Sequence, residues 1–130
     1  MESAELKNPL ELYDKYPFEL SGGMLQRVMI ASAIVTCPRL LILDEPTTAL
    51  DVTTQAEIID LLRRLNRDRG TTMIFISHDL GLIKKLCRRV AVMRSGEIVE
   101  MGDTERVFTA PEHEYTRLLI SSIPEGRRRR

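Results

Sequence analysis

Tryptophan is absent from this chain of 130 residues, and tyrosine and phenylalanine occur only three times each. The two cysteines, Cys37 and Cys87, are far apart and lack the Cys-x-x-Cys spacing of metal and redox sites. We therefore expect both to be small core residues of a reduced, cytosolic protein. No apolar run approaches the roughly 20 residues needed to span a bilayer, and the first residues do not have the pattern of a signal peptide. A role at a membrane would therefore require a partner.

The formal net charge is zero, but the charge is unevenly distributed. Four of the 19 basic residues are the arginines 127–130, which leaves the rest of the chain, with its 19 acidic residues, mildly acidic. We expect residues 125–130 to form a disordered, solvated tail, with contact to anionic lipid or nucleic acid as the alternative. The length and the apolar content of 43% predict one globular domain with a modest core.

The most informative stretch is Leu40–Asp51, with the sequence LLILDEPTTALD. Its apolar start predicts a buried strand of a parallel sheet, and Pro46 requires the chain to turn after it. Asp44 and Glu45 would then lie at the carboxyl end of the strand, where open α/β sheets bind ligands. Adjacent acids can divide the work, Asp44 holding a magnesium ion and Glu45 orienting and deprotonating a water molecule. The alternative is a strand followed by an ordinary polar turn.

A second informative stretch is Ser21-Gly22-Gly23, which precedes an apolar helical pattern from Met24 to Ile34. The first N–H groups of a helix have no partner inside it, and the helix dipole is positive at that end. Glycines allow a phosphate to approach the backbone, so Ser21–Gly23 can bind a phosphate. The alternative is a plain helix cap.

The remaining pattern predicts a regular alternation of helices and strands. A helix begins at Asp51 and ends at Gly70, and the β-branched run Thr71–Ser77 predicts a second buried strand that ends in Ser77-His78-Asp79. After it we expect a helix from Leu80 with a basic end at Arg88 and Arg89, and a hairpin of Val90–Met93 and Ile98–Met101. A short helix over Asp103–Phe108 and a last helix over Pro111–Ser122 should follow.

Four stretches in this order resemble the motifs of one family. LSGGMLQR at 20–27, LLILDEP at 40–46, TALD at 48–51 and SHD at 77–79 are similar to the signature, Walker B, D-loop and H-loop of ATP-binding-cassette (ABC) ATPases. Longer phrases, YPFELSGGMLQRVMIA, DEPTTALDVTTQAEIIDLL and PEHEYTRLLISSIP, resemble the branch that imports peptides and nickel. In that branch a proline more often stands where this chain has Glu114.

The resemblance implies an α/β fold, a P-loop NTPase-like parallel sheet flanked by helices, with ATP and Mg²⁺ as cofactors. It implies a role for each matching residue. Asp44 would serve the magnesium ion, Glu45 would be the general base and His78 would touch the γ-phosphate of ATP. The remaining roles concern the dimer: Asp51 would couple the two sites, and the γ-phosphate held by the opposite subunit would be contacted by Ser21, Gly22 and Gly23.

The family's phosphate-binding Walker A loop, GxxxxGK[ST], has no counterpart, because the chain contains no Gly-Lys pair. The resemblance therefore implies the C-terminal half of a nucleotide-binding domain over residues 1–124. We expect three parts in it: a signature region at 13–38, a Walker B and H-loop core at 39–101, and C-terminal helices at 102–124. One face and one edge of the sheet would be uncovered, and the chain alone would bind ATP weakly and hydrolyse it negligibly.

The implied partners are transmembrane permease subunits and a second ABC ATPase subunit, at the cytoplasmic side of the inner membrane, with no nucleic acid. Two interpretations remain open. The chain is part of a transporter ATPase that drives peptide or nickel uptake, or it is a truncated or split domain that binds a partner without catalysis. A non-transport ATPase of the same superfamily is a third, less favoured by the ending PEHEYTRLL.

Overall fold

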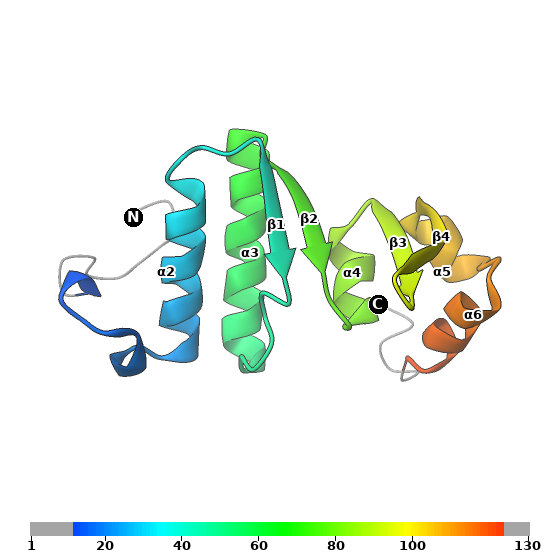
Figure 1. Ribbon diagram of the computed structural model, residues 1–130, viewed down its shortest axis with the longest axis horizontal. Helices are drawn as coiled ribbons and strands as arrows, with labels where there is room; N and C mark the ends of the chain where they lie inside the picture. Colours follow the sequence, from blue (N-terminus) through cyan, green and yellow to red (C-terminus); the bar gives the residue numbers. More distant parts are fainter. Residues whose placement is uncertain (1–11, 124–130) are drawn as a thin grey trace. The chain divides into compact units, whose positions relative to one another are not determined.

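The structure is a computed structural model that describes residues 12–123. The chain divides between Ile76 and Ser77 into two compact units, which are described separately (Figure 1). The first unit contains a 3-10 helix η2 (Pro17–Glu19), helix α2 (Gly22–Ile34), strand β1 (Leu40–Asp44), helix α3 (Val52–Arg69) and strand β2 (Thr72–Ile76). The second contains α4 (Leu80–Leu86), β3 (Arg89–Arg94), β4 (Glu97–Asp103), α5 (Thr104–Thr109) and α6 (Glu114–Ser121).

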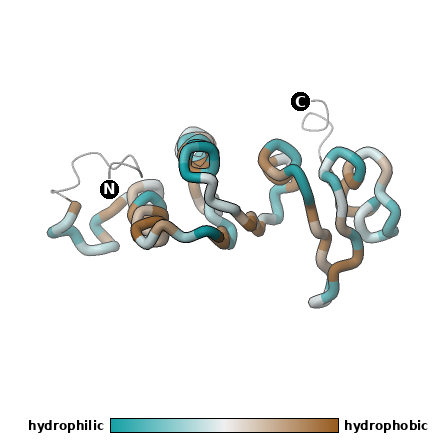
Figure 2. The backbone as a smooth tube through the Cα atoms, turned by 90° about the horizontal axis from the view of Figure 1, so that it is seen from above, coloured by the Kyte–Doolittle hydropathy of each residue, from teal (hydrophilic) through white to brown (hydrophobic). Residues whose placement is uncertain are grey.

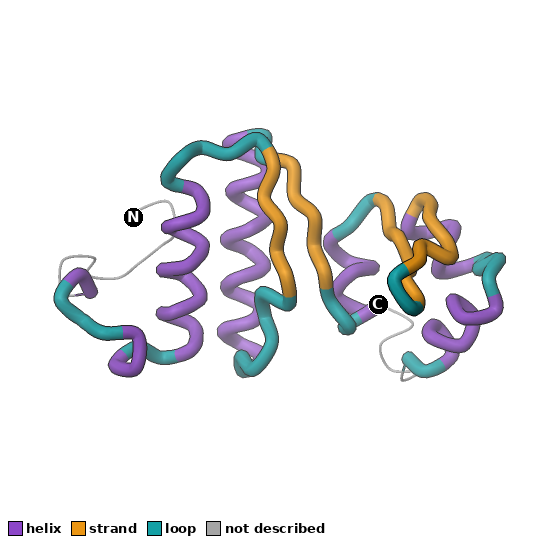
Figure 3. The backbone as a smooth tube through the Cα atoms, viewed as in Figure 1, coloured by secondary structure: helices purple, strands orange, loops and turns teal. Residues whose placement is uncertain are grey.

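The predicted parallel pairing of the first unit is confirmed. β1 and β2 run parallel, with Leu40 beside Thr72 and Asp44 beside Ile76, and α3 is the crossover that joins them (Figure 3). Both ends of α3 lie where the sequence predicts them. Asp51 caps its first turn, and Gly70 ends it in the left-handed conformation at φ 64° that glycine adopts without strain.

The core of the first unit is aliphatic. Leu41 and Leu43 of β1 are both 7% exposed, and side chains of α2 and α3 are buried with them. The buried helix residues are Ile30, Ile34, Ile58, Ile59, Leu61, Leu62 and Leu65. They recur at helical spacing along α3, which explains how a helix with many charged residues still buries one side.

The prediction that both strands are buried is wrong for one face of the sheet. Hydrophobic residues follow one another along β1 and β2 (Figure 2), yet Leu40, Ile42, Ile74 and Ile76 are 48%, 61%, 47% and 47% exposed. Strand register places these four on the same face, which we call the uncovered face. Within residues 12–123 each of the two strands also has one unpaired edge. The expected uncovered face is therefore confirmed, and the two described strands leave two open edges where one was expected.

The second unit is built on the predicted hairpin. β3 and β4 pair antiparallel around a two-residue turn, in which Ser95 and Gly96 have φ of 51° and 86°. Positive φ at both positions is typical of the hairpin turn whose twist matches the strands. The predicted basic end of the preceding helix is wrong, because α4 ends at Leu86 and Arg89 begins β3. The basic residues in the last turn of α4 are Lys84 and Lys85.

A buried carboxylate joins the hairpin to the last helix. Glu100 of β4 is 8% exposed, and its Oε1 and Oε2 accept hydrogen bonds from the N–H groups of Glu112 and His113, both at 3.0 Å. His113 in turn caps α6 through Nδ1, which accepts from the N–H of Tyr115 at 3.1 Å. Helix α6 therefore begins at Glu114 and not at Pro111, because Glu100 fixes the preceding loop.

Three further expectations concern exposure and the ends of the chain. Cys37 was expected in the core but is exposed, in a loop at φ 50°, whereas Cys87 is half-buried. Within the described range, no helix has both the length and the hydropathy to cross a bilayer. The expectations for the first residues and for the arginine tail fall on 1–11 and 124–130, outside the described residues.

Candidate functional site

The candidate site begins at the carboxyl end of β1. Asp44 is the last residue of that strand and is exposed on the same face as Ile42 and Leu40, two positions and four positions away. Glu45 follows, half-buried, and its N–H donates to the carbonyl oxygen of Ile76 at the end of β2, at 2.9 Å. The two acids therefore lie where both parallel strands end, as the sequence predicts.

Glu45 is held by its own turn. It adopts a φ of 46°, in the left-handed region that costs a non-glycine residue about 1 to 3 kcal/mol. The N–H of Thr48 donates to the Glu45 carbonyl at 3.2 Å, and the Thr48 hydroxyl donates to Glu45 Oε2 at 2.7 Å. Thr48 thus fixes both the backbone and the carboxylate of Glu45. Thr48 was not among the predicted site residues, although its position three residues after Glu45 in the sequence is a signal for such a bond.

Asp51 is the N-cap of α3. Its Oδ1 accepts from the N–H groups of Thr53 and Thr54, both at 3.0 Å, and its Oδ2 accepts from the Thr54 hydroxyl at 2.6 Å. These bonds, the hydroxyl of Thr54 first among them, lower the pKa of the exposed Asp51 carboxyl below its ordinary value. The carboxylate is therefore charged and fixed in direction, and capping is one of its tasks.

Ser21, Gly22 and Gly23 form the start of α2. Ser21 Oγ accepts from the N–H of Met24 at 3.3 Å, so Ser21 is the N-cap and its hydroxyl can still donate. Among the residues that the structure describes, the N–H groups of Gly22 and Gly23 have no acceptor. This end of a 13-residue helix offers N–H donors and a positive dipole, which suits a phosphate oxygen.

The two glycines also have a packing role that the sequence did not reveal. A Cβ atom at Gly22 would lie 3.3 Å from Leu50 Cδ2, and one at Gly23 would collide with Thr54 Cγ2. Arg27, one helical turn further along α2, forms an ion pair of 2.8 Å with Glu57 of α3. The Ser21–Gly23 stretch and the Asp51 turn, 30 residues apart in sequence, therefore lie side by side.

His78 follows β2, as predicted, and is exposed. The segment around it is ordered by its neighbours: Ser77 Oγ accepts from the N–H of Asp79 at 3.0 Å, and Asp79 caps α4 through bonds from Gly81 and Leu82. His78 belongs to the second unit and the other site residues to the first. Within the first unit the structure therefore brings Glu45 to the end of β2, and Ser21–Gly23 to the Asp51 turn.

The side chains near Asp44 can be compared with the ligands that a magnesium ion requires. Within residues 12–123 no group of three or more histidine, cysteine, aspartate or glutamate side chains could hold a metal. Mg²⁺ in nucleotide sites is usually bound through one or two carboxylates together with phosphate oxygens and water. A single exposed Asp44 beside the end of the sheet fits that role, and it does not fit a site made of protein ligands alone.

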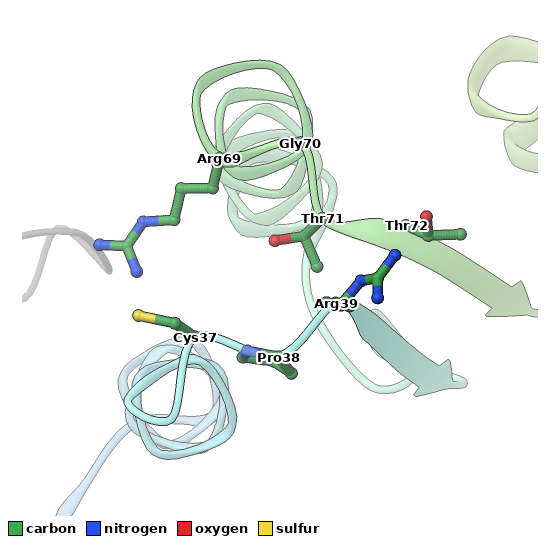
Figure 4. A pocket seen from close by; sticks show the side chains of 7 residues that line it. All are labelled: Cys37, Pro38, Arg39, Arg69, Gly70, Thr71 and Thr72. Atoms are coloured by element: carbon green, nitrogen blue, oxygen red, sulfur yellow. The ribbon is translucent and has the colours of Figure 1, made fainter.

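An open pocket lies at the other end of the strands. Its volume is about 650 Å³, and it is lined by residues 37–39, before β1, and by residues 69–72, which run from the last residue of α3 to the first of β2 (Figure 4). These are the amino ends of the parallel strands, so the pocket is separate from Asp44 and Glu45. It is not the predicted nucleotide site.

Two family models match the chain. The model described as "ABC transporter" matches residues 1–48, and the model described as "Oligopeptide/dipeptide transporter, C-terminal region" matches residues 99–130. The first match includes Ser21–Gly23 and ends four residues after Asp44. The second includes Glu100, His113 and α6.

Curated relatives agree with both matches. The chain is 54% identical over 121 residues to the peptidoglycan transport ATP-binding protein YejF of Agrobacterium fabrum, which covers 93% of this chain and 22% of that protein. It is 55% identical over 113 residues to the oligopeptide transport ATP-binding protein AmiE of Streptococcus pneumoniae (87% and 32%), and 49% identical over 120 residues to the dipeptide transport ATP-binding protein DppD of Escherichia coli (92% and 37%). The chain therefore spans about a fifth to two fifths of the length of these relatives.

Solved structures agree in fold. The ATP-binding cassette MJ0796, a dimer in a post-hydrolysis state bound to ADP and Pi, is 33% identical with a TM-score of 0.68, over 79% of this chain and 43% of that one. CbiO1 of Clostridium perfringens, part of the transporter complex cbiONQ, is 32% identical with a TM-score of 0.72, over 97% and 48%.

The fold is thus that of part of an ABC ATPase domain. Within that class, the chain is similar to part of the ABC transporter ATP-binding proteins of the oligopeptide/dipeptide type.

Proposed function

We propose that the chain contributes the C-terminal half of a nucleotide-binding domain in the ATP-binding subunit of a peptide importer, in which ATP hydrolysis drives uptake across a membrane. The observation that carries this proposal is the placement of Asp44 and Glu45 at the joint end of two parallel strands, with Asp44 on the uncovered face. A polypeptide layer that covers Leu40, Ile42, Ile74 and Ile76 must end beside Asp44. A phosphate-binding loop at the end of that layer would complete the nucleotide site.

Each side chain has a task in that completed site. Bound ATP supplies the phosphoanhydride bond that is hydrolysed, with Mg²⁺ neutralising its phosphate charge. Asp44 would hold the ion, and Glu45 would orient a water molecule and accept its proton. Thr48 fixes the Glu45 carboxylate through the 2.7 Å bond, so that it need not be ordered at the moment of reaction. His78 would contact the γ-phosphate, the role that the family resemblance gives it.

The Ser21–Gly23 stretch acts on the nucleotide of the opposite subunit, where its free N–H groups and the α2 dipole stabilise the γ-phosphate. The partners are therefore a second ABC ATPase subunit and transmembrane permease subunits, at the cytoplasmic side of the inner membrane. Peptides are the favoured cargo because the relatives' names include oligopeptide and dipeptide transport. Nickel, which the sequence resemblance also allowed, has no such support and stays a prediction.

The test is reconstitution. The chain is purified alone and mixed with an amino-terminal segment of a relative that carries a Walker A loop, and Mg-ATPase turnover is measured. We expect negligible turnover from either part and activity from the mixture. Glu45→Gln should reduce the activity of the mixture by about 10² to 10⁴, the usual contribution of a general base. Glu97→Gln, which removes an exposed carboxylate at the hairpin turn, is the matched control and should leave it unchanged.

The competing interpretation is a chain that binds a partner without catalysis. A mixture that forms a stable complex but shows no turnover would favour it. Turnover by the isolated chain that Glu45→Gln abolishes would contradict the expectation that this chain lacks an essential part of the site.

A further inference from the structure

We infer that Thr54 is a positioning residue that links the Ser21–Gly23 stretch to the Asp51 carboxylate within one chain. The two ends of this short side chain face different motifs. The hydroxyl donates to Asp51 Oδ2 at 2.6 Å, and the methyl group Cγ2 occupies the space where Gly23 has no side chain. The orientation of one threonine is therefore shared between the start of α2 and the start of α3.

The Thr54 side chain packs so tightly against Gly23 that a movement of the α2 start toward α3 would displace it. A Cβ atom at Gly23 would collide with Thr54 Cγ2, and the rest of the threonine lies close behind, with Cβ at 3.7 Å and Oγ1 at 3.8 Å from the same point. A displacement of the α2 start toward α3 must therefore push the threonine side chain away. Cγ2 and Oγ1 are attached to the same carbon, Cβ. A rotation about the Cα–Cβ bond that moves the methyl group therefore also turns the hydroxyl away from Asp51.

A second contact keeps the two helices in register. Arg27 and Glu57 lie one turn beyond Gly23 and Thr54 on their respective helices and form an ion pair at 2.8 Å. The guanidinium side of the pair is 13% exposed. With two points of contact, α2 cannot rotate about the Gly23–Thr54 contact alone or slide along α3. A movement of the α2 start is therefore transmitted to the Thr54 side chain.

In the proposed function, Thr54 would connect the Ser21–Gly23 stretch to the Asp51 carboxylate of the same chain. Ser21–Gly23 would touch the nucleotide of the opposite subunit, and Asp51 would couple the two sites. If that function is correct, Thr54 lets phosphate contact at Gly23 reset the direction of the Asp51 carboxylate. The link itself is a property of the first unit and exists without nucleotide, so it can be tested independently of catalysis.

The test measures the pKa of Asp51 by NMR titration in the full chain without nucleotide. Thr54→Val keeps the methyl group against Gly23 and removes the hydroxyl, so the pKa of Asp51 should rise toward its ordinary value. Thr54→Ser keeps the hydroxyl and removes the methyl group, so the lowered pKa should be retained. Gly23→Ala should raise the pKa by displacing Thr54, and the double variant Gly23→Ala with Thr54→Ser should restore the lowered pKa.

The rescue by serine separates a link from general damage, because a merely disordered α2 would not be repaired by a smaller residue on α3. An Asp51 pKa that is the same in Gly23→Ala as in the unmodified chain overturns the inference, as does a double variant with the pKa of Gly23→Ala alone. If Gly23→Ala does not fold, Asp51→Asn tests the link in reverse. It should shift the amide resonance of Gly23, and an unchanged Gly23 resonance overturns the link.

Discussion

The interiors of the two units contain different kinds of buried residue. Between Leu12 and Ile76 the buried hydrophobic residues are nine isoleucines and leucines of α2, β1 and α3, and the acids described in that range lie outside this core. Between Ser77 and Ile123 the buried hydrophobic residues are Ile83, Val92 and Val107, and the buried polar residues are Glu100, Thr104 and Thr116.

The difference separates acids available for chemistry from an acid used for structure. Asp44 and Asp51 are exposed at the end of an aliphatic unit that does not need them for its core. Glu100 is buried in a unit too small to be stabilised by apolar contacts alone, and it compensates with two bonds from the backbone of the following loop. Burial and partner type thus distinguish the candidate site from the structural carboxylate.

The largest effect should come from the aliphatic core. Ile58 of α3 is fully buried, so Ile58→Ala should lower the free energy of unfolding by about 3 kcal/mol through lost contacts and a cavity. Ile42 lies on the uncovered face, and Ile42→Ala should cost less than about 0.5 kcal/mol in the isolated chain. Urea denaturation followed by circular dichroism measures both. Equal losses would mean that the uncovered face is already covered in solution.

A smaller effect should come from the polar interior of the second unit. Glu100→Gln places an amide NH₂ group against a backbone N–H, which should cost about 2 kcal/mol. Hydrogen exchange of the Glu112 and His113 amides measures the loss locally, with Glu97→Gln as the exposed control. Unchanged protection of these two amides would contradict the role assigned to Glu100.

The same carboxylate predicts a pH dependence. Burial raises the pKa of Glu100, but the N–H donors of Glu112 and His113 and the nearby Arg106 guanidinium lower it more, so the net pKa lies below the ordinary 4.5. A lowered folded-state pKa stabilises the unit above about pH 4.5, and that stabilisation is lost as the pH falls through the folded-state pKa. The difference in the free energy of unfolding between the unmodified chain and Glu100→Gln should therefore become smaller at acid pH. A difference that stays constant with pH would show that ionisation of Glu100 does not stabilise the fold.

The smallest effect concerns the thiols and leaves stability unchanged. Cys37 is exposed in the first unit, whereas Cys87 is half-buried in the second and burial raises its pKa above the ordinary 9.0. A thiol reagent near neutral pH should therefore modify Cys37 at least about tenfold faster than Cys87. Single Cys→Ser variants assign the two rates. Faster reaction at Cys87 would show that the second unit opens readily.

Local sequence determined the elements and their ends. Ser21, Asp51, Asp79 and Asp103 cap the helices they precede, and Gly70 ends α3, because each of these features depends on hydrogen bonds or backbone angles within a few residues. The order of apolar runs likewise predicted the parallel pair, the hairpin and the placement of Asp44 and Glu45 at a strand end.

Only the tertiary structure decided which side of a strand faces protein. Leu40 and Leu41 are the same residue type in adjacent positions, yet one is 48% and the other 7% exposed, because the layer against each face comes from distant parts of the polypeptide. For the same reason the sequence could not reveal the bond of Glu100 to the loop before α6 or the contact of Thr54 with Gly23. Caps are short-range and can be predicted from neighbours, whereas packing depends on which segments meet in space.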